Sequence, residues 1–331
     1  MQVGESLKLS SQLDSALREL KLILDSSESP SSYRWALNHI GDIYKLRSNI
    51  DEALKNYELC ERLALEANDR ELIAEVSADL AELHMREAER LSGLDNKLSM
   101  HNQDLYKHYL DLETANVNES SSREARARSY RNRAKYARAH GDAEGSIYLY
   151  EKALEFQDRG TASHQLLIPY AKALRLVNRS EEAIKQVEAV LNWSHQINAL
   201  RSEAIARQYK GLLLLERILS ISSDPDAADF KDAAHELGLA LKLHEEIGFQ
   251  QGYQETSVDL FELEIQKGNF ESGLQFLRES TLFEGHPDID NQTMFVSVLA
   301  QLTTNGEGKR ANRIVSRLKV LGIDNVEQQG E

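Results

Sequence analysis

The sequence predicts an all-α protein made of repeated helical hairpins. Only four prolines occur in 331 residues, and no run of alternating β-branched residues suggests a strand. The chain is rich in Ala, Leu, Glu, Lys and Arg, all of which favour helix. In addition, one spacing of small and aromatic residues recurs along most of the chain. Together these observations predict helices that pack against their neighbours and no large sheet.

The clearest copy of the spacing lies between Arg34 and Arg62. Where two helices of a hairpin cross closely, a small residue is needed at the contact point, and larger side chains fill the groove on either side. Gly41 is expected to be that point in the first helix, and Ala53 in the second. The residues that complete the pattern are Leu37, Ile40, Tyr44, Tyr57 and Cys60.

Further copies follow along the chain, and each second helix opens with a small residue. Successive copies are 37 residues apart in mid-chain and 39 and then 38 residues apart later, longer than the roughly 34 residues of the commonest helical repeat. A single hairpin cannot bury its own apolar face, so stacked copies are expected. The small residues are Ala16, Ala53, Ser146, Ala183, Ala234, Gly273 and Ala311.

This pattern resembles the tetratricopeptide (TPR) repeat in its extended variety, over nearly the whole chain. The resemblance implies a right-handed α-α superhelix, or solenoid, of about seven TPR-like hairpins. It also implies a scaffold for protein–protein interaction, in which the first helices of the hairpins line a concave groove that binds peptides.

A solenoid grows linearly, so residues 1–331 are expected to form one array rather than two ordinary domains. Residues 1–30 are interpreted as an initial half-repeat, with Gln12–Asp25 as its helix, which contacts another domain or chain. Residues 91–122 enlarge the second hairpin, with a helix near 97–114 that carries Leu98, Leu105, Tyr109 and Leu112 on one face. Residues 220–229 form an insertion loop, and residues 322–331 a polar tail.

The composition excludes some classes of binding partner and indicates the cellular compartment. A formal charge of −15 argues against general binding to nucleic acid or to an anionic membrane. No apolar run approaches the length of a transmembrane helix, and the amino terminus lacks a targeting signal. The one cysteine, Cys60, allows no internal disulfide. A cytoplasmic protein is therefore expected.

Basic residues are nevertheless concentrated between Arg123 and Arg138. At about 100° per residue, Arg128, Arg131, Lys135 and Arg138 fall on one helical stripe. By the TPR resemblance this stripe would face the groove, and the next hairpin would add Lys172 and Arg175. Such a site suits a carboxylate-rich peptide, a peptide carboxy terminus or a phosphate-bearing ligand. The alternative is that these residues pair with acids of neighbouring hairpins, namely Glu144, Glu181 and Glu182.

Signatures of catalysis and of metal binding are missing from the sequence. There is no His-Glu-x-x-His motif and no paired cysteine arrangement for zinc, and no base lies beside a nucleophile in a known pattern. We therefore expect neither an enzyme nor a cofactor. Two functions remain open: an adaptor that binds a partner protein or peptide, and a ligand-responsive sensor that regulates a partner effector. The adaptor requires fewer unobserved features and is preferred.

Overall fold

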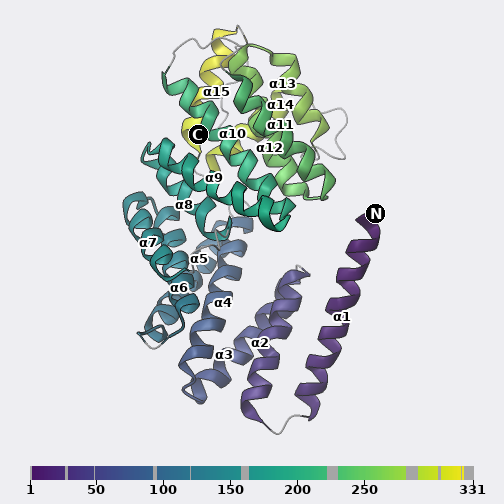
Figure 1. Cartoon of the computed structure of the whole chain (residues 1–331), viewed down its shortest axis with the longest axis vertical. Helices are drawn as coiled ribbons and strands as arrows, with labels where there is room; N and C mark the ends of the chain where they lie inside the picture. Colours follow the sequence, from purple (N-terminus) through teal and green to yellow (C-terminus); the bar gives the residue numbers. More distant parts are fainter. Residues whose placement is uncertain are drawn as a thin grey trace. The chain divides into compact units, whose positions relative to one another are not determined.

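The computed structural model describes residues 2–26, 29–47, 49–91, 95–119, 121–157, 164–221, 230–280, 290–304, 307–321 and 323. These residues form helices joined by turns, and none of them forms a strand. The all-α prediction is therefore confirmed for the part of the chain that is described (Figure 1). The chain divides into two compact units, Met1–Asp158 (unit 1) and Arg159–Glu331 (unit 2). Each unit is described by itself.

Consecutive helices pack against one another within both units. In unit 1 the helices are α1 (Gln2–Ser26), α2 (Pro30–Leu46), α3 (Ile50–Glu66), α4 (Arg70–Leu91), α5 (Asn96–Asn116), α6 (Arg123–Ala139) and α7 (Ala143–Phe156). In unit 2 they are α8 (His164–Leu176), α9 (Ser180–Ile197), α10 (Leu200–Ile221), α11 (Lys231–Glu246), α12 (Gln250–Lys267), α13 (Phe270–Glu279), α14 (Asn291–Thr304) and α15 (Gly308–Val320).

Polar caps and left-handed residues set the ends of many helices. Asp142 caps α7 by accepting a hydrogen bond of 2.8 Å from the backbone N–H of Gly145, which satisfies a donor left over at the helix start. The turn before it contains Gly141 at φ 83°, a conformation that glycine adopts without a Cβ clash. Asn178 and Gly268, in the turns before α9 and α13, also have positive φ.

Gly41 is a point of close approach, as expected. A Cβ at this position would lie 2.6 Å from Cε1 of Tyr57 in α3, so only glycine lets the ring pack directly on the backbone of α2. The Tyr57 hydroxyl then reaches Asp42 and donates a hydrogen bond of 2.7 Å. Unit 2 uses the same device at Gly211, where a Cβ would lie 2.6 Å from Cγ of Leu237.

Buried apolar residues form a core in each unit. In unit 1, helices α2 to α5 bury Tyr57, Leu80 and Tyr106 in one cluster. In unit 2, helices α12 to α15 share a cluster that includes Phe261 and Phe295, whose ring centroids are 5.5 Å apart. The last helix therefore belongs to the core of its unit.

Two expectations about helices were wrong. The first helix begins at Gln2 rather than near Gln12. In α11 the buried residues include Ala233, Leu237 and Ala240, so the small residue at the contact is Ala233 rather than the expected Ala234. This happens because Leu237 must face Gly211.

Helix α5 covers the helix that was expected near 97–114. Its expected apolar face is confirmed in part, because Leu105, Tyr109 and Leu112 pack in the core of unit 1, whereas Leu98 is 48% exposed. The side chains that α5 buries are Ser99, Tyr106, Tyr109, Leu110 and Glu113. Most of the predicted insertion loop at 220–229 and of the polar tail at 322–331 lies outside the described residues.

Candidate functional site: a basic edge on α6

Helix α6 is amphipathic in an unusual way, because most of its polar surface is cationic. It begins after Ser122, whose Oγ accepts a hydrogen bond of 3.1 Å from the backbone N–H of Ala125. On one side Arg126 lies over the ring of Phe156, with its Cζ 4.8 Å from the ring centroid. Four other cations line another side, which we call the basic edge: Arg128, Arg131, Lys135 and Arg138.

Lys135 lies near the middle of the basic edge and is partly buried. Burial, with Arg131 and Arg138 beside it, lowers the pKa of Lys135 to about 8, although Glu82 of α4 opposes the shift. Among the described residues, no carboxylate oxygen lies within 4.0 Å of its ammonium nitrogen. Burial and the neighbouring Arg128 also lower the pKa of Arg131. The basic edge therefore concentrates positive charge around a lysine that has no ion pair in the described part of the chain.

Two acids of α4 that interact electrostatically with the basic edge are already engaged with other cations. Asp79 of α4 lies 2.5 Å from Nζ of Lys45 in α2, and Glu82 forms ion pairs with Lys45 at 3.6 Å and with Arg86. Although burial raises it, Lys45, Arg86 and Lys135 hold the pKa of Glu82 below its usual range. Because Glu82 serves several cations, it does not neutralise the basic edge.

Glu113 of α5 is a buried carboxyl beneath the basic edge, with a side chain 1% exposed. Asn132 of α6 donates hydrogen bonds of 3.4 and 3.2 Å to its two oxygens, and Nε of Arg128 lies 4.0 Å away. Burial raises the pKa of Glu113 to about 7, although Asn132 and Arg128 oppose the shift. Near neutral pH this group therefore carries only part of a negative charge.

The two other cations of the predicted site lie in unit 2, on α8. Lys172 lies over the ring of Tyr209, with Nζ 5.7 Å from the centroid. Arg175 forms a bidentate pair with Glu216, at 2.7 and 2.8 Å, and contacts Glu307 at 3.3 Å. Its side chain is 13% exposed. Arg175 is therefore engaged in the packing of its own unit.

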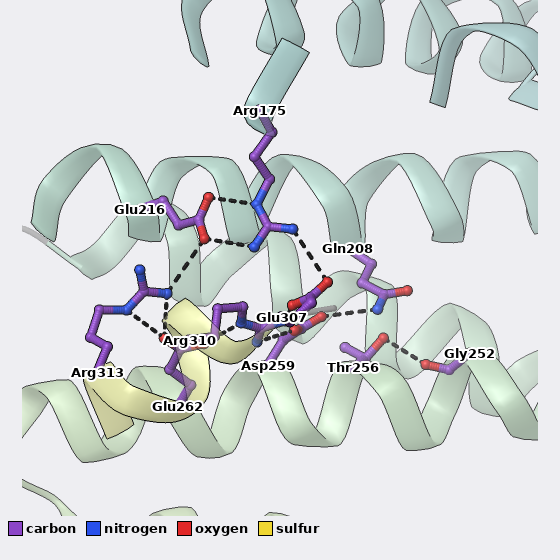
Figure 2. Close-up of polar contacts among 10 residues, drawn as sticks. All are labelled: Arg175, Gln208, Glu216, Gly252, Thr256, Asp259, Glu262, Glu307, Arg310 and Arg313. Carbon is purple, nitrogen blue, oxygen red and sulfur yellow. Dashed lines mark hydrogen bonds and ion pairs between the residues drawn. The ribbon is translucent and has the colours of Figure 1, made fainter. Parts of the chain in front are cut away.

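Arg175 belongs to a cluster of ion pairs that joins four helices of unit 2 (Figure 2). Arg310, with a side chain 5% exposed, contacts Asp259 and Glu262 at 2.7 Å each and Glu307 at 2.6 Å. Although burial lowers it, these three carboxylates hold the pKa of Arg310 well above its usual range. We call this set the ion cluster, and its members are Arg175, Glu216, Asp259, Glu262, Glu307, Arg310 and Arg313.

Sequence analysis did not find the ion cluster beyond Arg175. Its members are far apart in the chain: 132 residues separate Arg175 from Glu307. The acids proposed as alternative partners of the predicted cations also have other contacts. Within unit 2, Glu182 pairs with Arg179 at 2.7 Å, and Glu181 pairs with Arg217 at 3.2 Å.

Comparison with known proteins does not identify a family. A scan against models of known protein families and a search of curated proteins both found no match to this chain. Among the described residues, no group of three or more His, Cys, Asp or Glu side chains is arranged to hold a metal ion. None of the described helices combines the length and the apolar character that crossing a bilayer requires.

Proposed function

We propose that this protein is a non-catalytic, cytoplasmic scaffold or adaptor, and that the basic edge of unit 1 binds an anionic segment of a partner protein or peptide. The proposal includes the TPR-like architecture, a single right-handed solenoid of about seven hairpins over residues 1–331. In such an array the basic edge would face a concave groove. Repeated helical hairpins support the architecture, and the charge of Lys135, which Glu82 offsets only in part, supports the site.

The charge of Lys135 carries the argument. Keeping an ammonium group partly buried beside two guanidinium groups costs folding free energy. An arriving carboxylate or phosphate would offset that cost, and the cation would need little further desolvation. Arg175 gives no such reason for binding, because Glu216 and Glu307 already pair with it.

A defined anionic probe tests the proposal. An octaglutamate peptide with a fluorescent label would be titrated with the full chain, and fluorescence polarisation would report binding. We expect the double variant Lys135→Gln, Arg138→Gln to bind at least tenfold more weakly, since each lost charge-assisted contact contributes about 1.5–3 kcal/mol.

The matched control is Arg62→Gln, Lys107→Gln, which removes two cations from exposed positions on α3 and α5. We expect this control to bind within about twofold of the unaltered chain, because exposed charges contribute little. Circular dichroism would show whether both variants keep their helices. Equal losses in the two variants, or no binding by the unaltered chain, would overturn the proposed site.

A further inference from the structure

In unit 2, a face that carries several carboxylates is covered by helix α15 of the same unit. Helix α15 lies against α12 and buries Ala311, Ile314 and Leu318 in the core of the unit. Its polar side carries Arg310 and Arg313 toward carboxylates of other helices (Figure 2). The charged face of unit 2 is thus occupied by a helix that belongs to the same unit.

The contacts of α15 and of Glu307, the residue before it, reach three helices in all. Arg310 contacts Asp259 of α12, and Arg313 contacts Glu216 of α10 at 3.4 Å. Glu307, just before the helix, accepts a hydrogen bond from Arg175 of α8. The three side chains Glu307, Arg310 and Arg313 follow one another at intervals of three residues, which brings them to neighbouring positions along one side of a helix.

In both units, some helices also contact the helix two places further along the chain, so that alternate helices form a row. Helix α4 contacts α6, as α8 contacts α10 and α10 contacts α12 in unit 2. In the described part of unit 1, however, no helix supplies carboxylates to Lys135 as α15 supplies arginines to Asp259 and Glu262. The signs of the charges are also reversed: in unit 1 the row of alternate helices carries the cations on α6, whereas in unit 2 the row carries carboxylates on α10 and α12 and α15 supplies the arginines.

We infer that the basic edge binds an acidic helix of a partner protein, whose carboxylates are spaced by three or four residues and pair with Arg131, Lys135 and Arg138. This inference rests on the proposed function and specifies its partner. The partner helix would take the place in unit 1 that α15 takes in unit 2, with the signs of the charges exchanged.

The spacing of the basic edge favours a helix over an extended chain. Along α6 the rise is about 6 Å from Arg131 to Lys135 and about 4.5 Å from Lys135 to Arg138. Carboxylates at positions i, i+4 and i+7 of a helix lying alongside have the same spacing. In an extended chain, side chains on one face recur about every 6.8 Å, so a carboxylate that meets Lys135 leaves the next one out of register with Arg138.

The test uses three labelled peptides. The first is an alanine-rich helical peptide with glutamates at i, i+4 and i+7. The second has the same composition, with its glutamates distributed around the helix, and the third is octaglutamate. Circular dichroism would verify that the first two peptides are equally helical, and fluorescence polarisation at 150 mM salt would measure binding to the full chain.

We expect the first peptide to bind at least tenfold more tightly than the second and third, and the variant Lys135→Gln, Arg138→Gln to abolish that preference. If all three peptides bind equally and lose affinity equally in the variant, the proposed function stands and the helical partner is wrong. If octaglutamate binds most tightly, the helical partner is again wrong. If none of them binds, both proposals fail.

Discussion

Lys135 of unit 1 is a partly buried cation and Arg310 of unit 2 a fully buried one, and their surroundings differ. Three carboxylates lie within 2.7 Å of Arg310, whereas none in the described part of the chain lies within 4.0 Å of Lys135. The pKa of Arg310 is accordingly raised and that of Lys135 is lowered to about 8. A buried cation can therefore hold a unit together or weaken it, depending on which carboxylates the fold brings to it.

This difference separates structural charge from charge available for binding. A paired, hydrogen-bonded ion cluster is consistent with a role in packing. A buried cation without a carboxylate partner lowers stability, and residues that break a local rule in this way are expected at functional sites. The contrast supports the basic edge, rather than α8, as the binding site.

Removing Arg310 should have the largest effect on stability. In Arg310→Ala, Asp259 and Glu262 lose their buried partner, and we expect unit 2 to lose about 3–5 kcal/mol of unfolding free energy. Each unit contains one tryptophan, Trp35 in unit 1 and Trp193 in unit 2. Urea unfolding followed by fluorescence in a Trp35→Phe background therefore reports on unit 2.

Lys309→Ala is the control for Arg310→Ala, because Lys309 is the exposed neighbour on the same helix. We expect it to change the unfolding free energy by less than about 0.5 kcal/mol. If Arg310→Ala unfolds at the same urea concentration as this control, the ion cluster does not stabilise unit 2 and the contrast between the units fails.

Local features could be predicted from the sequence, because neighbouring residues determine them. Gly41 was recognised as a close-approach point from the pattern around it, and the structure places the ring of Tyr57 there. Three turns between helices contain Gly141, Asn178 and Gly268 at positive φ, and these are residue types that tolerate that conformation. The basic edge was also visible, because its members share one helical stripe.

Features that depend on distant partners could not be predicted. Arg175 resembles the residues of the basic edge in sequence, and its engagement became evident only with Glu216 and Glu307, 41 and 132 residues away. The register of α11 failed for the same reason. Ala233 and Ala234 are equivalent locally, and the contact between Leu237 and Gly211 decides which of them is buried.

Both units contain a glycine at a close contact between two helices, and substituting such a glycine tests how tightly the helices pack. Gly41→Ala should destabilise unit 1 by about 1–3 kcal/mol, because the new methyl group would overlap the Tyr57 ring. Gly238→Ala in unit 2 is the matched control, since a Cβ there meets nothing within 4 Å. The control should stabilise its helix by up to about 1 kcal/mol. Urea unfolding of both variants measures these changes, and a stabilised Gly41→Ala would show that α2 and α3 are not closely packed.

The smallest and most discriminating change concerns Lys135. Lys135→Met keeps the long apolar stem and removes the charge, so we expect unit 1 to gain about 1–2 kcal/mol at pH 7. The pKa of Lys135 is about 8 in the folded chain, below the roughly 10.4 of an unfolded lysine. The cost of its charge is therefore full below pH 8 and disappears as the pH rises toward 10.4.

The advantage of Lys135→Met should accordingly shrink between pH 8 and pH 10. Trp35 fluorescence in a Trp193→Phe background would report urea unfolding of unit 1 at both values. The same substitution should weaken binding of the acidic helical peptide, so that stability and affinity change in opposite directions. A loss of stability at pH 7 would mean that the charge is compensated in the folded chain. The basic edge would then resemble the ion cluster of unit 2, and the argument for a binding site at Lys135 would fail.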